Sequence, residues 1–392
     1  MSESLTVESR KTQWEERTLG EVCEIISGQS PNGNTINSEG QGVAFFQGKK
    51  QFKRYFLGNC ESWTTDPKKF AYKNSILMSV RAPVGPVNIS TEKISIGRGL
   101  ASINAGSDIN YKFLFYFLMS IKDSIKGNEG STFSNINRNQ ISSIKIPYIH
   151  LEEQERIVDV LDKAFETIDK AIANTEANLA STKELFQSVL NDTFQNKGDD
   201  WEEKALGDAF DVRDGTHDSP KYVEEGFPLV TSKNLKGSEL NFEKVKYISE
   251  KDFLEINKRS KVNEGDLLMA MIGTIGNPIV VPSDCNFAIK NVALFKAKKD
   301  RTQLLCYLLK SPKVISSFMR DAKGSTQKFV SLGYLRQFKV FMPNITVQDN
   351  LINKLDSLST KTKQLEALYE NKLASLKELK QSLLQKAFSG AL

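Results

Sequence analysis

Residues 151–196 read LEEQERIVDVLDKAFETIDKAIANTEANLASTKELFQSVLNDTFQN, and this stretch decides how the rest of the chain is interpreted. It contains neither Gly nor Pro, so it predicts one uninterrupted helix of roughly 65 Å at about 1.5 Å per residue. Apolar or small residues recur in steps of three and four, which places them on one stripe, while charged and amide side chains cover the other faces. The stripe consists of Ile157, Leu161, Ala164, Ile168, Ile172, Leu179, Phe186 and Val189.

The same pattern occurs a second time. QERIV at 154–158 is echoed by QDNLI at 348–352, and LASTKELFQSVL at 179–190 by LASLKELKQSLL at 373–384, both at an offset of 194 residues. A second repeat precedes each helix, because WEERTLGEV at 14–22 is echoed by WEEKALGDA at 201–209, at an offset of 187. The chain is therefore two copies of one unit, each a globular part followed by a long helix.

These repeats predict the organisation of the chain. We expect an N-terminal tail at 1–13, a first globular domain at 14–149, a first helix at 150–198, a second domain at 199–344 and a second helix at 345–392. Within each domain, a buried strand and a Gly/Pro turn lead into a second strand, at 77–90 and 268–281.

Short buried helices are predicted at 111–121 and 302–309, and a strand ending in Pro closes each domain, at 146–147 and 342–343. Two amphipathic helices of equal length from one chain can bury their stripes against each other. The predicted class is α+β: two α/β domains joined by two long helices that form an intramolecular antiparallel coiled coil, as an internal repeat.

Composition narrows the class of protein. Of 392 residues, 39% are hydrophobic and 26% charged, which is ordinary for a soluble globular protein. The net charge of +5 permits nucleic-acid binding without demanding it. The four cysteines are far apart, with no CxxC pair, so the sequence predicts no disulfide framework or zinc site, and a reducing cytoplasm is expected. The polar first twenty residues show no signal peptide, and the most apolar run, 113–121, is too short to span a membrane.

Motifs that would indicate an enzyme are missing. GVAFFQGKK at 42–50 has five residues between its glycines and Lys50 where a phosphate loop needs Ser or Thr. No Asn-Pro-Pro-aromatic motif of an amino-methyltransferase occurs. Asp200, Glu202 and Lys204 faintly resemble a nuclease motif, but they lie in the repeated WEE start, which favours a structural role. We expect no catalytic residues, no metal site and no cofactor bound by this chain.

In this order and in duplicate, the features resemble the specificity subunit of type I restriction–modification systems, over nearly the whole chain. They are the WEE starts at Trp14 and Trp201, the paired strand–turn motifs, the Gly-Ser-Thr turns at 130–132 and 324–326, and the Pro-terminated strands before Gln154 and Gln348. Asp349 and Leu351 depart mildly from the usual Gln-Glu-x-Ile helix start.

The resemblance implies two target recognition domains and a non-catalytic subunit that selects a bipartite, asymmetric site in double-stranded DNA. It also implies complex partners: two methyltransferase subunits, which carry S-adenosylmethionine, and motor-nuclease subunits. The alternative is a tether with two protein-binding domains and no DNA role. Steep salt dependence of DNA binding would separate the two, because phosphate contacts produce it.

Candidate DNA contacts lie in loops that differ between the copies, since residues 41–63 have no recognisable relative in 225–253. Shared scaffolds with different loops suggest two versions of one kind of ligand. Arg81 opens a tight turn where the second copy has Ile272, so structure alone does not require it. In the first domain the candidates are Gln47, Lys49, Lys50, Lys53, Arg54, Arg81, Arg98, Ser131, Thr132, Asn135, Asn137 and Arg138.

In the second domain, GTHDSPK at 215–221 and SKN at 232–234 resemble loops of target recognition domains. The candidates there are Thr216, His217, Lys221, Ser232, Lys233, Asn234, Lys290, Asn291, Ser325, Gln327 and Lys328. Arg and Lys can pair with guanine, and Asn and Gln with adenine. The competing interpretation is a solvated basic loop or ordinary turn chemistry, which Ser and Asn also serve. Aromatic residues such as Phe45, Phe46, Phe115 and Tyr116 are expected in the core instead.

Overall fold

The computed structural model describes residues 14–125, 135–199, 201–237, 239–282, 286–298, 301–325 and 327–392. The chain divides into two compact units. Unit 1 comprises Met1–Thr175 and Asn371–Leu392, and unit 2 comprises Glu176–Glu370. Each unit thus contains one globular domain with a segment of both long helices.

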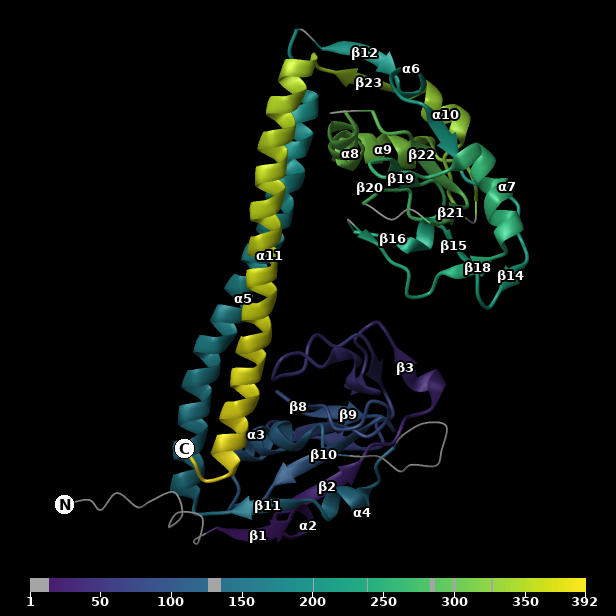
Figure 1. Ribbon diagram of the computed structural model, residues 1–392. Coiled ribbons are helices and arrows are strands. Elements are labelled where there is room, and N and C mark those ends of the chain that lie inside the picture. Colours follow the sequence, from purple (N-terminus) through teal and green to yellow (C-terminus); the bar gives the residue numbers. More distant parts are fainter. Residues whose placement is uncertain are drawn as a thin grey trace, which may run out of the picture. The chain divides into compact units, whose positions relative to one another are not determined.

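Unit 1 is built on an antiparallel sheet in the order β2 (Cys23–Ser27), β10 (Leu100–Ala105), β7 (Ile76–Ser79) and β8 (Val87–Ile89). A separate ribbon pairs β1 (Glu15–Thr18) with β11 (Lys145–Tyr148), so the first and last strands of the domain lie together (Figure 1). The associated helices are α2 (Leu19–Val22), α3 (Tyr111–Ile121) and α4 (Arg138–Ser142). The core of unit 1 gathers around α3, whose Phe113 and Leu114 are fully buried.

A second sheet completes unit 1, in the order β3 (Ile36–Asn37), β5 (Trp63–Thr64), β4 (Val43–Phe46), β9 (Ile94–Ile96) and β6 (Phe70–Ala71). Two short 3-10 turns flank β4, η1 (Gly33–Thr35) and η2 (Lys49–Gln51). Strands β4 and β9 run parallel, so their carboxyl ends lie at the same edge of the sheet. That edge is where the candidate interface forms.

Unit 2 repeats this plan. The ribbon is β12 (Glu202–Ala205) with β23 (Lys339–Met342), and the sheet order is β13 (Val212–Asp214), β22 (Val292–Phe295), β19 (Leu267–Ala270), β20 (Gly276–Val280). Its second sheet is β14 (Tyr222–Val223), β18 (Lys246–Ile248), β15 (Phe227–Val230), β21 (Ala288–Ile289). The remaining elements are η3 (Ser232–Asn234), the hairpin β16 (Leu235–Lys236) and β17 (Glu239–Leu240), and the helices α6 (Leu206–Ala209), α7 (Glu250–Ser260), α8 (Thr302–Lys310), α9 (Pro312–Asp321) and α10 (Leu332–Gln337).

The predicted strand pairs and short helices are confirmed, with one adjustment: Pro147 lies inside β11, which continues to Tyr148. The second sheets also correspond, although their sequences show no relation. Strands β4, β5 and β9 have the same neighbours and directions as β15, β18 and β21. A short strand needs only residues of suitable type at its buried positions, so these strands persist while the sequence changes. Unit 1 adds β6 at the edge where unit 2 has α7.

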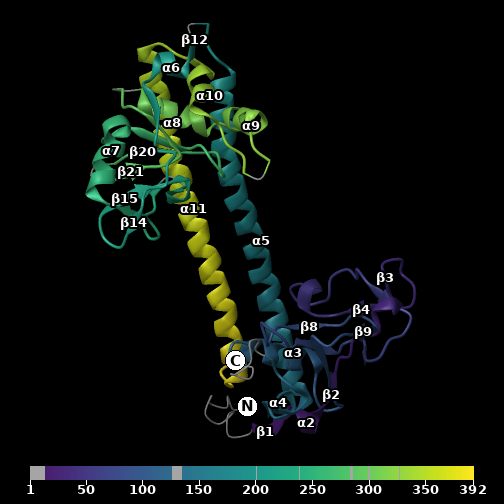
Figure 2. The ribbon, with the colours of Figure 1, turned by 90° about the vertical axis from the view of Figure 1, so that its right-hand side faces the viewer.

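Both long stretches are continuous helices, α5 (Leu151–Gln195) and α11 (Ile345–Phe388). Within unit 1, Asp169 of α5 is 2.9 Å from Lys380 of α11, and α3 packs against both helices (Figures 1 and 2). Within unit 2, Leu190 and Leu355 share a small buried cluster. The start of one helix therefore lies beside the end of the other in each unit. The predicted α+β class with an antiparallel helix pair is confirmed.

One polar contact anchors each domain to its long helix, and it occurs in both copies. In unit 1, the Tyr116 hydroxyl donates to the Asp162 carboxylate at 2.5 Å, and Lys112 reaches the same carboxylate at 2.6 Å. In unit 2, Tyr307 donates to Asp356, which also accepts from Gln303 at 3.1 Å. Burial and this hydrogen bond raise the pKa of both phenols, so the tyrosines stay neutral donors.

The repeated glutamine of the helix start has a structural role. Gln154 is fully buried, and its amide donates to the carbonyls of Asp108 at 2.9 Å and Ile149 at 2.8 Å. Its side-chain oxygen accepts from the backbone N–H of Asn110 at 2.8 Å. Gln348 donates to Pro343 in the same way, at 2.6 Å. The glutamine thus fixes the corner between the last strand and the helix by satisfying backbone groups that burial would otherwise leave unpaired.

We expect Asp162→Ala to destabilise the protein by about 1–3 kcal/mol, because it leaves the buried hydroxyl of Tyr116 without its acceptor. Asp356→Ala should act similarly through Tyr307. Urea unfolding followed by circular dichroism measures both. Asp192→Ala, which removes an exposed carboxylate from the same helix, is the matched control.

Adding Tyr116→Phe to Asp162→Ala should recover part of the loss, because the unpaired hydroxyl is then gone. Equal stability of Asp162→Ala and wild type would show that the anchor contributes nothing.

Candidate nucleic-acid interface

The carboxyl ends of the parallel strands β4 and β9 bring polar side chains together in unit 1. Gln47 follows β4, and Arg98 lies in the link between β9 and β10. The end of β2 joins them, because the N–H of Gln29 donates to the carbonyl of Ile96 at 3.0 Å. Ser30 then donates to Gln47 Oε1 at 2.9 Å and accepts from Arg98 Nε at 3.3 Å.

The equivalent edge of unit 2 holds a second polar set. The N–H of Thr216 donates to the carbonyl of Ile289 at 3.0 Å, which places His217 where unit 1 has Ser30. Asn291 Oδ1 lies 2.8 Å from His217 Nδ1, and its carbonyl accepts from Ser232 Oγ at 3.3 Å. We call these sets the crossing clusters. They are Ser30, Gln47 and Arg98 in unit 1, and His217, Ser232 and Asn291 in unit 2.

In each unit a glycine allows two backbone segments to cross in close contact. A Cβ at Gly28 would lie 2.2 Å from the carbonyl oxygen of Gly97, and one at Gly215 would lie 2.2 Å from that of Ile289. Backbone cannot move aside cheaply at either place, so no other residue fits without a shift of the chain. Asn291 has a φ of 53°, a left-handed conformation that Asn tolerates better than most residues. The shared framework is backbone, and the side chains on it differ.

A buried carboxylate supports the crossing cluster of unit 2. Asp214, on β13, is only 2% exposed. His217 Nε2 lies 2.9 Å from its Oδ2, and Arg259 of α7 forms an ion pair with it. A buried carboxylate needs such partners, and here they connect the cluster to α7, which unit 1 replaces with β6. The imidazole is therefore held between a fixed carboxylate and the Asn291 amide.

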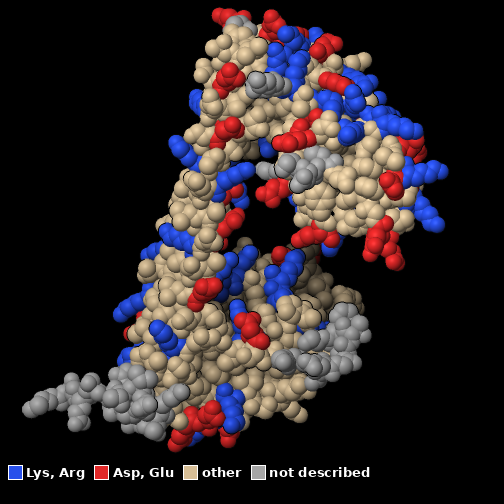
Figure 3. Space-filling view, in the orientation of Figure 1, with Lys and Arg blue, Asp and Glu red and all other residues tan. Residues whose placement is uncertain are grey.

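A basic hollow of about 510 Å³ surrounds Asn291 in unit 2. Its lining includes the lysines Lys233, Lys244, Lys246 and Lys290. Lys246 lies 4.2 Å from the ring centre of Tyr222, and Lys290 Nζ is 2.5 Å from Ser219 Oγ. In the space-filling view, Lys and Arg gather over the outer side of unit 2 around α7 and α10 (Figure 3). The lysines that line the hollow suit contacts with a DNA phosphate backbone.

Several predicted contacts lie close to the crossing clusters. The N–H of Val80 donates to the Gly99 carbonyl at 3.0 Å, which sets Arg81 beside the unit 1 cluster, and Arg81 forms a β-bridge with Asn135. In unit 2, Gln327 lines the basic hollow. The predicted residues that line the hollow or lie beside it are Thr216, His217, Ser232, Lys233, Asn234, Lys290, Asn291 and Gln327.

Other predicted contacts lie on the surface around them. Lys50 pairs with Glu61 at 2.5 Å, and Asn137 caps α4 by accepting from the Gln140 N–H at 3.0 Å. The remaining described candidates are wholly or partly exposed: Lys49, Lys53, Arg138, Lys221, Ser325 and Lys328. Ser131 and Thr132 lie outside the described residues.

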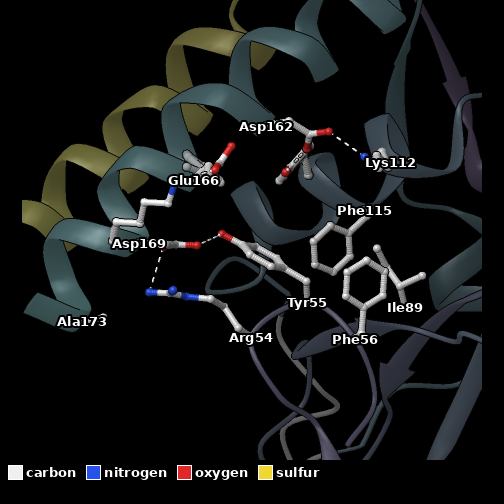
Figure 4. A pocket seen from close by; sticks show the side chains of 13 residues that line it. Arg54, Tyr55, Phe56, Ile89, Lys112, Phe115, Asp162, Glu166, Asp169 and Ala173 are labelled. Atoms are coloured by element: carbon white, nitrogen blue, oxygen red, sulfur yellow. Dashed lines mark hydrogen bonds and ion pairs between the residues drawn. The ribbon is translucent and has the colours of Figure 1, made fainter.

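Two candidate residues make structural contacts within the protein. The side chain of Asn234 is buried and caps η3, accepting from the Thr231 N–H and donating to the Asn241 carbonyl, both at 2.9 Å. Arg54 pairs with Asp169 of α5 at 2.8 Å, where Tyr55 also binds (Figure 4). Lys380 contacts the same carboxylate.

Arg54 thus lines a cavity of about 480 Å³ against the helix, away from the crossing cluster. A polar residue in a variable loop looks the same in sequence whether it faces DNA or packs against a buried group, so the sequence could not foresee these contacts, and both residues stay predicted DNA contacts.

Sequence reasoning missed Ser30, Asp214, Lys244 and Lys246. A signal existed for Ser30, because it stands two residues after Gly28, as His217 does after Gly215. Nothing in the sequence marks the other three, since only the folded sheet brings β13 and the segment before β18 to this edge. Among the described residues, no group of three or more His, Cys, Asp or Glu side chains could hold a metal ion. No helix in the described ranges is long and apolar enough to cross a membrane.

A family model described as type I restriction modification DNA specificity domain matches residues 11–177 and 198–375. The chain belongs to this family. The chain is similar to a putative type I restriction enzyme MjaX specificity subunit of Methanocaldococcus jannaschii, with 40% identity over 181 residues. These residues are 45% of this chain and 42% of that protein. The matched region therefore spans less than half of that relative.

The EcoBI specificity subunit of Escherichia coli is 22% identical over 97% of this chain and 86% of its own length. A chain from a structural study of type I restriction–modification assembly shares the fold with a TM-score of 0.77 at 18% identity, covering 97% of this chain and 98% of that one. The HsdS subunit from Thermoanaerobacter tengcongensis has a TM-score of 0.56 at 18% identity, with 97% of each chain covered. The comparisons support the DNA-specificity interpretation and not the tether.

If the hollow holds phosphates, Lys233→Gln and Lys244→Gln should each weaken binding to all duplexes alike. Each should also reduce the slope of log affinity against log salt by about one. Fluorescence anisotropy with two unrelated duplexes across a salt series measures this. Lys251→Gln, an exposed α7 position that does not line the hollow, is the control. Unchanged slopes in both hollow variants would place the DNA elsewhere.

Proposed function

We propose that this chain is the DNA-specificity subunit of a type I restriction–modification complex and recognises a bipartite, asymmetric site in double-stranded DNA. One observation carries the proposal. The two domains share a backbone framework down to the crossing glycines, Gly28 and Gly215, but present different polar side chains on it. Two domains with the same backbone framework but different polar side chains are suited to two different half-sites in DNA.

The chain acts in the cytoplasm as a non-catalytic member of the complex. Its own residues supply recognition and attachment surfaces, and the chemistry belongs to partner subunits. S-adenosylmethionine would bind to the methyltransferase subunits, and motor-nuclease subunits would join through the assembled complex. The candidate interface supports this division, because its described residues are donors, acceptors and cations suited to bases and phosphates.

The partner surface is proposed from apolar side chains that are exposed at equivalent positions of the two helices. Leu185 of α5 is 51% exposed and Leu379 of α11, 194 residues later, is 48% exposed. Leu151 and Ile345, the first residues of the two helices, form a second such pair at 41% and 59%. Unit 2 contains Leu185 and Ile345, and unit 1 contains Leu151 and Leu379. Each unit therefore exposes one residue of each pair. A surface presented twice fits two copies of one methyltransferase subunit.

Exchanging residues 14–148 for the same region of a relative with a known site should change only one half of the methylated motif. Each domain reads its own half-site, so the half assigned to unit 2 remains. Methylome sequencing of a host carrying the hybrid complex gives the result. The reciprocal exchange of residues 201–342 is the matched control, and it should change the other half alone. A hybrid that alters both halves would contradict independent readers.

Leu185→Asp and Leu379→Asp should each remove one methyltransferase copy from the complex, and the double variant should remove both. Removing one leucine that the partner would bury should weaken methyltransferase binding at that site by about 10- to 150-fold. Native mass spectrometry at a partner concentration that just fills both wild-type sites counts the copies. Leu254→Asp, at a 56% exposed leucine on α7 outside both long helices, should leave two copies bound. Two copies on the double variant would exclude this surface.

A further inference from the structure

The two crossing clusters differ in the kind of hydrogen bonds that they offer. The link from β9 to β10 in unit 1 has three residues, Gly97 to Gly99. The equivalent link from β21 to β22 in unit 2 has two, Lys290 and Asn291. Both links begin after equivalent strand ends, since β4 pairs with β9 as β15 pairs with β21. The side chains of the links are Arg98 in unit 1, and Lys290 and Asn291 in unit 2.

Arg98 is exposed, and its guanidinium is held at Nε. Its Nε donates to Ser30 Oγ at 3.3 Å, and that hydroxyl is oriented by Gln47 at 2.9 Å. Among the described residues, the structure shows no hydrogen bond from the two terminal nitrogens. A planar fork with two parallel donors matches the O6 and N7 acceptors that guanine presents in the major groove.

Asn291 is held at its backbone and at its side chain. Its N–H donates to the Thr216 carbonyl at 3.1 Å, and its carbonyl accepts from Ser232. The side-chain oxygen contacts His217 at 2.8 Å, which leaves that oxygen a second lone pair. An amide presents one acceptor and one donor in a plane, which matches the N6 amino group and N7 of adenine.

We propose that Arg98 and Asn291 are the base-reading residues of their half-sites, with Arg98 reading a guanine and Asn291 an adenine. This rests on the proposed function. His217 is the positioning residue for Asn291, because it joins the amide to the buried Asp214 carboxylate. The lysines around Asn291 are assigned to phosphates, which an ammonium group binds as a point charge.

The test selects duplexes from a DNA library that is randomised over both half-sites, using the full chain in complex with its methyltransferase subunits. Arg98→Gln should change one base pair of one half-site from G·C to A·T, because Gln pairs with adenine. Asn291→Arg should change one base pair of the other half-site from A·T to G·C. Discrimination at the altered position should shift by about 5- to 150-fold, the range for a bidentate base contact.

Each variant carries its own folding control, because the half-site of the unaltered domain must be selected as before. Lys73→Gln and Lys251→Gln, at exposed positions of the two domains, should leave the whole motif unchanged. His217→Ala should reduce discrimination at the Asn291 position while keeping affinity for random duplexes. His217→Gln, which can still donate to the Asn291 oxygen, should restore part of the discrimination.

The outcomes separate the two proposals. If the wild-type complex selects no motif, the proposed function itself fails. If it selects a bipartite motif that Arg98→Gln and Asn291→Arg leave unaltered, the chain reads DNA but not through these residues. Loss of preference at every position of a half-site would also overturn the inference, because it would indicate a structural role.

Discussion

A hydrogen bond from a buried tyrosine to a carboxylate on a long helix holds each half of this protein together. Tyr116 binds Asp162, and Tyr307 binds Asp356. The tyrosine is buried where α3 or α8 packs on the long helix, so its hydroxyl depends on the carboxylate as acceptor. The contact sets how each globular domain sits on its helix segment, and therefore where the carboxyl ends of its parallel strands lie. The contact is present in both copies, as is the buried glutamine at the start of each long helix.

The framework and the crossing clusters are physically separate. The framework is made by buried strands and by two glycines that allow backbone segments to cross, at Gly28 and Gly215. The crossing clusters sit on this framework at partly or fully exposed positions. Replacing an exposed side chain there costs the core little, whereas replacing a buried one creates a cavity or strain. The recognised sequence can therefore change without changing the fold, which is what a specificity subunit requires.

The two units differ in how the rest of the helix surface is covered. In unit 1, Asp169 is buried among Arg54, Tyr55 and Lys380, and burial lowers the pKa of Lys380 while the Asp169 carboxylate opposes that shift. Unit 2 uses apolar packing, with Phe186 against Tyr307. A buried charge cluster adds little net stability, but it tolerates only one geometry, whereas apolar surfaces can slide. Unit 1 therefore fixes the contact between its variable loop and both helices more specifically.

The sequence by itself determined the repeat, the two long helices, the short helices and strands, and the family, because helical periodicity and duplicated motifs are local patterns. It also identified Arg98, His217, Ser232 and Asn291 as candidates, since polar residues in a variable loop stand out. Only the tertiary structure decided which of them meet. It joined Ser30 to Arg98, brought Asp214 and two further lysines to the same edge, and gave Arg54 and Asn234 partners within the protein. Pairing of parallel strands sets these meetings, and that pairing joins residues far apart in the chain, so no local pattern could reveal it.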